Sequence, residues 1–174
     1  RAFARACPGG LVCKLVDSGA VTVEGPDAAA QVPTFALDDL DDLDGLELAP
    51  MIVQERLDKR VELRVTIVGH DVFAADLDPR GALDVRTDPA LLADLRPSGA
   101  LPPALRARLL DLCTRLGLNL ASADVVGTRD DRWVLLEINA TTYFDHVERA
   151  TGLPIATAVA DLLLGRTPPR ARRV

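Results

Sequence analysis

Residues 118–139 read LNLASADVVGTRDDRWVLLEIN, two apolar segments joined by a short polar one. The apolar segments have the composition of β-strands, and the polar residues between them are typical of a turn. We therefore expect a tight antiparallel hairpin closed at Asp130 and Asp131. Its register would pair Arg129 with Arg132, Val126 with Leu135, and Asp124 with Glu137.

Three oxygen-bearing side chains converge in this predicted hairpin. Glu137 and Asn139 are two residues apart, so they lie on the same side of their strand. Asp124 joins them because directly opposed residues share a side. The two carboxylates would repel each other unless a cation lay between them, and oxygen-only ligands favour Mg²⁺ over zinc. The alternative is an edge hairpin whose acidic side is simply exposed to water.

The composition limits the classes of protein to which the chain can belong. With 174 residues, 48% of them hydrophobic, it can bury a core as one large domain or two small lobes. A net charge of −6 argues against nucleic acid as the main partner. The sequence has neither a signal peptide nor an apolar run long enough to span a membrane. Its three cysteines are widely spaced, which is typical of free thiols in a reducing cytoplasm.

The remaining patterns predict a mixed α+β fold. Val61 to Val68 alternates apolar and polar residues, and a turn at residues 69–71 leads into a second strand at 72–77, as in a β-meander. A helix is expected from Pro102 to Leu116, with leucines along one face and Gly117 as its stop. Further strands are expected at 11–16, 21–23, 32–37 and 50–54, further helices at 143–150 and 153–164, irregular structure at 78–99, and a solvated helix or turn at 38–47.

Several segments resemble the ATP-grasp ligases. The LLEIN motif at 135–139 is similar to their metal-binding strand, and the longer matches are to the graspetide maturases, the microviridin-type peptide ligases. The similar segments are QERLDKRVELRVTIVGHDVFAADL (54–77), LPPALRARLLDLCTRLGL (101–118), RWVLLEIN (132–139) and TGLPIATAVADLL (151–163). The resemblance covers most of the chain, from Lys14 to about Leu164.

The resemblance implies the ATP-grasp fold, in which two α+β lobes of antiparallel sheet are flanked by helices. Residues 1–50 would then be part of the small lobe, and residues 51–165 the large lobe that carries the Mg-ATP site. Residues 166–174 form a basic tail that we expect to be disordered. The N-terminal domain that precedes these lobes in the family would lie outside this chain.

The resemblance also implies a role for individual residues. The metal ligands would be Asp124, Glu137 and Asn139. Arg64 and Arg86 would be the catalytic residues that neutralise charge on the transferred phosphate, because a guanidinium binds phosphate oxygens in two places. The ATP contacts would be Lys14 for the phosphates, Gln54, Glu55, Arg56 and Leu57 for the adenine, and Glu62 near the ribose.

Each of these residues also has a plainer interpretation. Lys14 could be a lysine on an edge strand whose charged end reaches the solvent. Glu62 and Arg64 could form an exposed ion pair of little energetic value, and Arg86 could be an ordinary loop arginine.

The function implied by the resemblance is an ATP-dependent carboxylate ligase that uses ATP and Mg²⁺. It would form ester or amide bonds through an acyl-phosphate, and in the graspetide maturases both reacting groups belong to a ribosomal precursor peptide. A ligase for a small molecule or glutamate, and a non-catalytic ATP-grasp fragment acting as a binding module, are the alternatives. The sequence leaves the oligomeric state open, a homodimer included.

Overall fold

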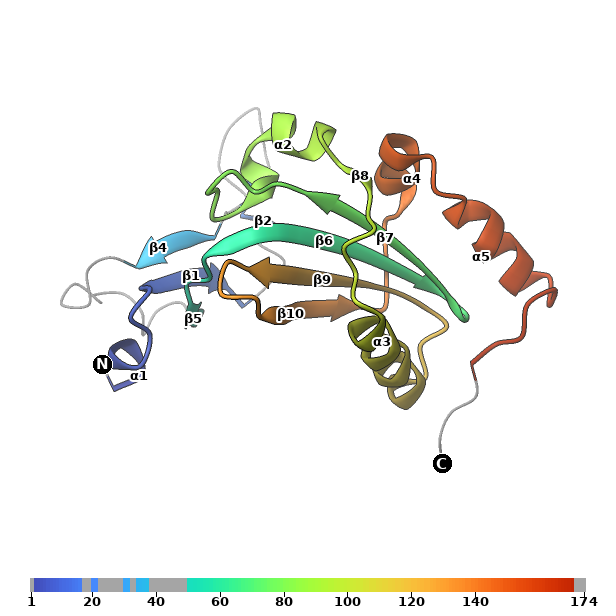
Figure 1. Cartoon of the computed structure of the whole chain (residues 1–174), viewed down its shortest axis with the longest axis horizontal. Helices are drawn as coiled ribbons and strands as arrows, with labels where there is room; N and C mark the ends of the chain where they lie inside the picture. The colour runs from blue at the N-terminus through green and yellow to red at the C-terminus, as the bar shows by residue number, and fades with distance from the viewer. Residues whose placement is uncertain (1, 17–19, 22–29, 32–33, 38–49, 171–174) are drawn as a thin grey trace. The chain divides into compact units, whose positions relative to one another are not determined.

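The computed structural model describes residues 2–16, 20–21, 30–31, 34–37 and 50–170 (Figure 1). These residues form two compact units, Arg1–Asp58 with Gly81–Pro89 (unit 1) and Lys59–Arg80 with Ala90–Val174 (unit 2). In this division the strand that follows residue 50 belongs to unit 1, and the assignment of residues 1–50 and 51–165 to two ATP-grasp lobes stays a prediction. The predicted acidic helix or turn at 38–47 lies outside the described residues.

Unit 1 is built around a three-stranded antiparallel sheet. Strand β1 (Leu11–Leu15) lies between β4 (Phe35–Leu37) and β5 (Met51–Glu55). Leu11 and Cys13 are buried on one face of β1, which explains why this short run folds as a strand. The other elements of unit 1 are helix α1 (Ala2–Arg5), the strand pair β2 (Ala20–Val21) and β3 (Ala30–Gln31), and the 3₁₀ helix η1 (Val85–Thr87).

Unit 2 contains a five-stranded antiparallel sheet in the order β10-β9-β6-β7-β8. Its strands are β6 (Lys59–Val68), β7 (Asp71–Leu77), β8 (Arg96–Pro97), β9 (Leu120–Thr128) and β10 (Trp133–Asn139). The helices that follow or interrupt the strands are α2 (Pro89–Ala93), α3 (Pro103–Leu116), α4 (Asp145–Thr151) and α5 (Ile155–Leu163). The predicted meander and the predicted hairpin are therefore neighbours in one sheet.

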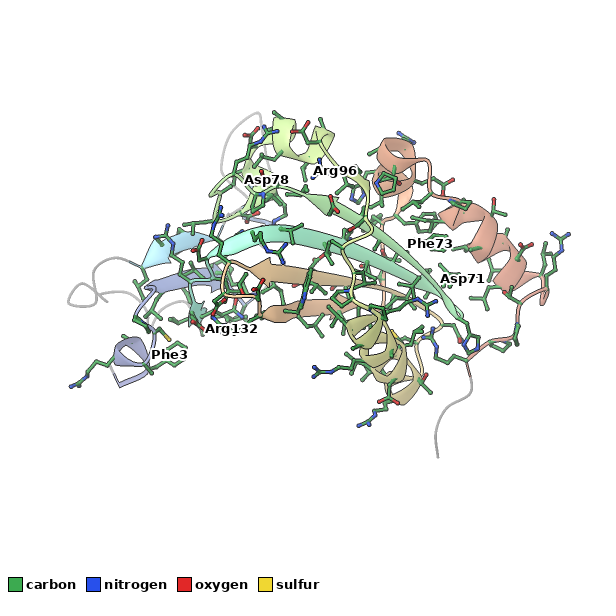
Figure 2. The ribbon with its side chains drawn as sticks, viewed as in Figure 1. Phe3, Asp71, Phe73, Asp78, Arg96 and Arg132 are labelled. Atoms are coloured by element: carbon green, nitrogen blue, oxygen red, sulfur yellow. The ribbon has the colours of Figure 1, made fainter. Side chains whose placement is uncertain are left out.

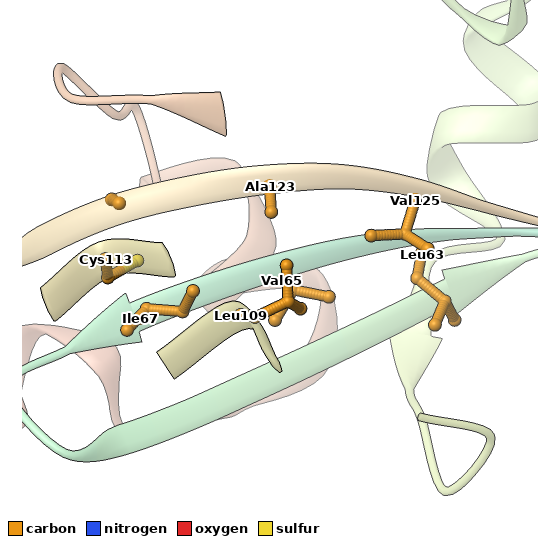
Figure 3. Packing of buried hydrophobic residues seen from close by; sticks show 8 residues of the cluster. Leu63, Val65, Ile67, Leu109, Cys113, Ala123 and Val125 are labelled. Atoms are coloured by element: carbon orange, nitrogen blue, oxygen red, sulfur yellow. The ribbon is translucent and has the colours of Figure 1, made fainter. Parts of the chain in front are cut away.

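Helix α3 covers one face of this sheet and forms the main core with it (Figure 3). Leu109 and Cys113 of α3 pack against the buried face of β6 and β9. The helix ends where expected, at Gly117, whose φ of 69° suits glycine better than any other residue. The core residues of the three elements are Leu63, Val65, Ile67, Leu109, Cys113, Ala121, Ala123 and Val125.

The other face of the sheet is covered only in part, by the C-terminal helices. Helices α4 and α5 lie behind the sheet when α3 lies in front (Figures 1 and 3). Val147 of α4 and Ile155 of α5 are completely buried, and α5 contacts β6. The connection from β10 to α4 passes behind the sheet as well (Figure 1). Among the described residues of unit 2, no helix covers the Lys59 end of β6 on the face opposite α3.

The C-terminal residues of the described chain are attached to unit 2. The backbone N–H of Arg170 donates to the Asn119 side-chain oxygen at 2.7 Å, and its guanidinium donates to the Leu118 carbonyl at 3.0 Å. The expected disordered tail began at residue 166, whereas the described chain is anchored as far as Arg170. Among the described residues, no helix is both long enough and apolar enough to cross a membrane.

We predict that Gly127→Ala destabilises unit 2 by about 1–3 kcal/mol. A Cβ atom at Gly127 would stand 2.8 Å from Val61 Cγ1 and 3.0 Å from the Trp133 ring, so the sheet or the ring must move. Urea unfolding monitored by Trp133 fluorescence measures the change. Gly99→Ala is the matched control, because its Cβ would meet no atom within 4 Å, and we expect a change below about 0.5 kcal/mol. Equal effects of the two substitutions would contradict the proposed close packing at Gly127.

Candidate functional site

The β9–β10 hairpin has a three-residue loop, Arg129–Asp131, and not the predicted two-residue turn. The Thr128 N–H donates to the Arg132 carbonyl at 2.9 Å, and the Thr128 hydroxyl accepts from the Arg132 N–H at 3.0 Å. Asp131 takes a φ of 60°, a left-handed conformation that aspartate tolerates. The predicted pairing of Arg129 with Arg132 is therefore wrong, and Val126 pairs with Val134 in place of Leu135.

A β-bulge in β10 restores the predicted pairing farther along the hairpin. The register shifts by one residue between Leu135 and Glu137, so Glu137 is the partner of Asp124, as predicted. Asn139, two residues later, pairs with Ser122. The bulge lets Trp133 and Ile138 both pack against the α3 core although they are five residues apart. Bulges of this kind commonly redirect side chains near functional sites.

The three predicted metal ligands lie together on the face of the sheet opposite α3. Asp124 lies between Arg64 of β6 and Glu137 of β10 in one cross-strand row. One guanidinium nitrogen of Arg64 donates to both Asp124 oxygens, at 2.7 and 2.9 Å. The Asn139 amide donates to Glu137 at 2.8 Å. The side chains of Arg64 and Asp124 are 23% and 32% exposed, so this ion pair is screened less than a surface pair.

The row of Arg64, Asp124 and Glu137 has two carboxylates and only one guanidinium, so its negative charge is not fully balanced. Burial raises the pKa of Asp124 above its ordinary value, and the neighbouring Glu137 carboxyl raises it further, while Arg64 lowers it only in part. The donors are two carboxylates and an amide oxygen, which suit Mg²⁺, an ion that usually completes its shell with water and phosphate. No cluster of three His, Cys, Asp or Glu side chains that could hold a metal occurs among the described residues. The arrangement therefore fits a hard cation that arrives with further oxygen ligands.

Glu62 lies two residues before Arg64 on the same side of β6. Its carboxylate accepts from Lys59 Nζ at 2.5 Å, and both side chains are largely buried. The predicted Glu62/Arg64 pair is therefore two separate ion pairs, one with Lys59 and one with Asp124. The face from Lys59 to Arg64 thus carries alternating charges.

The predicted adenine-side residues belong to unit 1, where the register separates them onto two faces. Lys14 of β1 pairs with Ile52 of β5, and Gln54 pairs with Val12, so Lys14 and Gln54 share the face opposite Leu11 and Cys13. Glu55 pairs with Leu11 and lies on the other face. Beyond the strand, Arg56 donates its N–H to the Gly10 carbonyl at 3.0 Å, and Leu57 is half-buried.

Asp84 is a residue of unit 1 that the sequence analysis missed. Its carboxylate binds the Arg86 guanidinium through two bonds, at 2.8 and 2.6 Å, and also accepts the Arg86 N–H and the Thr34 N–H. The Asp84 side chain is 6% exposed and that of Arg86 51%. Burial would raise the pKa of Asp84, but these donors outweigh it and hold the pKa well below its ordinary value. The D-x-R spacing was the available signal, since it places both groups at the start of η1.

Comparison with solved structures identifies the fold. The chain superimposes with a TM-score of 0.86, at 28% identity over 99% of its length, on a Chryseobacterium gregarium RiPP-associated ATP-grasp ligase in complex with ADP and a leader and core peptide. It also matches the macrocyclase MdnC of Microcystis aeruginosa, bound with the precursor peptide MdnA, at 30% identity over 95% of the chain with a TM-score of 0.79. No family model and no curated protein matches the sequence.

The chain therefore has the fold of the ATP-grasp ligases, as the resemblance implied. More particularly, it is similar to ligases and macrocyclases associated with ribosomal peptide modification, and MdnB of Microcystis aeruginosa is a further match at 26% identity and a TM-score of 0.66. The chain covers 53% of the Chryseobacterium ligase and 50% of MdnC, so it spans about half the length of the proteins it matches.

We predict that Asp84→Asn lowers stability by about 2 kcal/mol at neutral pH, because an uncharged amide loses most of the charged bonds to Arg86. A carboxyl whose pKa is lowered by folding stabilises the fold above its unfolded pKa and loses that effect as the pH falls toward the folded value. The difference between wild type and variant should therefore shrink as the pH falls from about 5 to about 2. Thermal melts across this range test the prediction, and a constant difference would contradict it.

Proposed function

We propose that this chain is the ATP-binding part of an ATP-dependent carboxylate ligase that joins side chains of a ribosomal precursor peptide. The observation that carries the proposal is the row of Arg64, Asp124 and Glu137 with Asn139 beside it. Two opposed carboxylates destabilise a sheet, and a bound cation would offset the part of the repulsion that Arg64 leaves. The similar solved proteins are described as bound to nucleotide or precursor peptide.

In the proposed mechanism, Asp124, Glu137 and Asn139 would hold Mg²⁺ on the face of the sheet opposite α3. The bound ion would draw charge from the phosphates of ATP and so make the γ-phosphorus a better electrophile. Arg64 now donates to both oxygens of Asp124. With the charge of Asp124 neutralised by a bound cation, the Arg64 guanidinium would be able to bind the transferred phosphate. Arg64 thus balances charge in both states.

The other predicted ATP contacts are proposed for each unit taken by itself. Lys14 and Arg86 would neutralise phosphate charge, and the two bonds from Asp84 would keep the Arg86 guanidinium in a fixed plane. Glu62 would bind ribose, and residues 54–57, Gln54 to Leu57, would bind adenine through their backbone groups.

The reaction would proceed in two balanced steps. A substrate carboxylate attacks the γ-phosphorus of ATP, and ADP leaves with the electron pair of the broken P–O bond. A hydroxyl or amine then attacks the resulting acyl-phosphate, loses its proton and expels inorganic phosphate. Each bond formed removes one water from the substrate in total. Positioning and charge neutralisation account for most of the rate in such reactions, so no protein nucleophile is needed.

The similar solved structures favour a peptide substrate over a small molecule. The Chryseobacterium ligase and MdnC structures both contain precursor, leader or core peptides. We place the protein in the cytoplasm, where ATP is abundant and the three cysteines, all buried and unpaired, would stay reduced.

We predict that Glu137→Gln weakens binding of Mg-ATP by about 10- to 100-fold, because the amide removes one of two metal-binding charges. Isothermal titration and the rise in melting temperature on adding Mg-ATP measure the loss. Asp111→Asn is the control, since Asp111 pairs with Arg115 on the surface of α3 and should bind nucleotide like the wild type. Equal binding of Mg-ATP by the wild type and Glu137→Gln would contradict the assignment of Glu137 as a metal ligand.

The peptide reaction is tested separately by mass spectrometry. We expect a candidate precursor peptide, incubated with the longer protein that contains this chain and with Mg-ATP, to lose one water mass for every bond formed. ATP binding without such a loss on peptides, but with ADP release on glutamate or another small carboxylate, would favour the small-molecule ligase.

A further inference from the structure

Four buried polar atoms close to the Arg64–Asp124–Glu137 row have no hydrogen-bond partner in the protein. They are Arg64 Nε and the hydroxyl oxygens of Thr66, Ser122 and Thr142. Thr66 and Ser122 are 0% exposed. A buried hydroxyl without a partner costs free energy, so a cluster of them requires a physical explanation. Among the described residues, only one other side-chain atom, on Arg170, is in the same situation.

The sheet register places these groups beside one another. Thr66 pairs with Ser122, and Ser122 pairs with Asn139, in the row next to that of Arg64, Asp124 and Glu137. Phe73 of β7 pairs with Thr66 and continues this second row across the sheet (Figure 2). Arg64 is two residues before Thr66 and therefore points to the same side.

The third hydroxyl comes from the connection that crosses this face. Strand β10 is at one edge of the sheet, whereas α4 contacts β8 at the other edge. Four strand spacings are roughly 19 Å, and the six steps from Asn139 to Asp145 span about 20 Å when extended. The connection therefore has to run almost straight over the second row. Along this connection Thr142 is half-buried and its hydroxyl oxygen is inaccessible to solvent, whereas Tyr143 is 78% exposed.

We propose that Thr66, Ser122, Thr142 and Arg64 Nε share one buried water molecule, enclosed between the sheet and the connection at 140–144. The chemistry selects water over the other small ligands. A cation would be repelled by the Arg64 guanidinium, and an anion by the carboxylates of Asp124 and Glu137 in the adjacent row. Water both donates and accepts, and a buried water typically makes about three hydrogen bonds to such groups.

The water gives Thr66 and Ser122 a positioning role. Arg64 uses one terminal nitrogen on Asp124, so a second bond at Nε fixes the plane of its guanidinium. Through the water, the hydroxyl groups of Thr66 and Ser122 would hold the Nε side of the Arg64 guanidinium in place. The catalytic meaning of this role rests on the proposed function. The water site itself depends only on the buried groups.

The first test is the sign of a stability change. Thr66→Val replaces the hydroxyl by a methyl group of the same size. A lone buried hydroxyl would make this substitution neutral or stabilising, whereas a hydroxyl bonded to water makes it destabilising. We expect the melting temperature to fall by about 2–4 °C for Thr66→Val and to recover in Thr66→Ser. Thr128→Val serves as the positive control, because the Thr128 hydroxyl donates to the Arg132 carbonyl at 3.0 Å.

Coupling to Arg64 is the second test. Lysine has no counterpart of the Arg64 Nε, so Thr66→Val should cost less in an Arg64→Lys background than in the wild type. An unchanged or raised melting temperature in Thr66→Val, or an equal cost in the two backgrounds, would overturn the proposal. A crystal structure at high resolution should show one ordered water between Thr66 and Ser122. The absence of electron density for a water there would also overturn the proposal.

Kinetics then separate this inference from the proposed function. In the longer protein we expect Thr66→Val to lower kcat about tenfold with the KM for ATP unchanged, and Thr66→Ser to restore it. If the wild type transfers no phosphate, the proposed function is wrong. The melting temperatures of the variants still test the water site in that case. Normal kcat in an active Thr66→Val enzyme would defeat the positioning role.

Discussion

The unit 2 site depends on one electrostatic constraint, the pairing of Asp124 with Glu137 across two antiparallel strands. Two carboxylates in this position repel each other, and burial makes the repulsion worse by removing water. Arg64 on the adjacent strand offsets part of this charge, and Lys59 does the same for Glu62 nearby. The remaining deficit of positive charge is what a cation bound to phosphate would supply. Under the proposed function, the ligand would complete the charge balance of this row.

The same sheet has two faces of different chemistry, which the alternation of β6 already indicates. Leu63, Val65 and Ile67 form a dry face under α3. The residues between them carry the charged and hydroxyl groups of the opposite face. Toward the Val68 end, α4, α5 and the 140–144 connection cover this second face, so its hydroxyl groups are buried. Toward the other end, Lys59 and Glu62 are also largely buried, and the side chains of Arg64 and Asp124 are 23% and 32% exposed. One strand therefore serves both the core and the candidate site.

Most of the elements in unit 2 and the opposition of Asp124 to Glu137 could be predicted from the sequence, because alternation and capping residues determine them locally. The hairpin loop could not, since Arg129–Arg132 suits a two-residue or a three-residue loop equally well. Burial of Trp133 favours the three-residue loop, because a two-residue turn would place Trp133 on the polar face of the sheet. The odd spacing of Trp133 and Ile138 was a usable signal. The Asp84–Arg86 pair has a local signal in its D-x-R spacing, but the Thr34 N–H that completes the contacts of Asp84 is 50 residues away in sequence.

The bulge in β10 has a consequence for how related chains should be compared. Leu136 is the extra residue: without it, the strand would read Trp-Val-Leu-Glu-Ile-Asn, and every remaining side chain would keep its present side of the sheet. A relative that is one residue shorter can therefore conserve the whole carboxylate row, with the gap placed at Leu136. A gap placed in the loop instead would shift the relative's equivalents of residues 133–135 by one position and so align them with positions on the other face of the strand, whereas Glu137 and Asn139 would stay aligned.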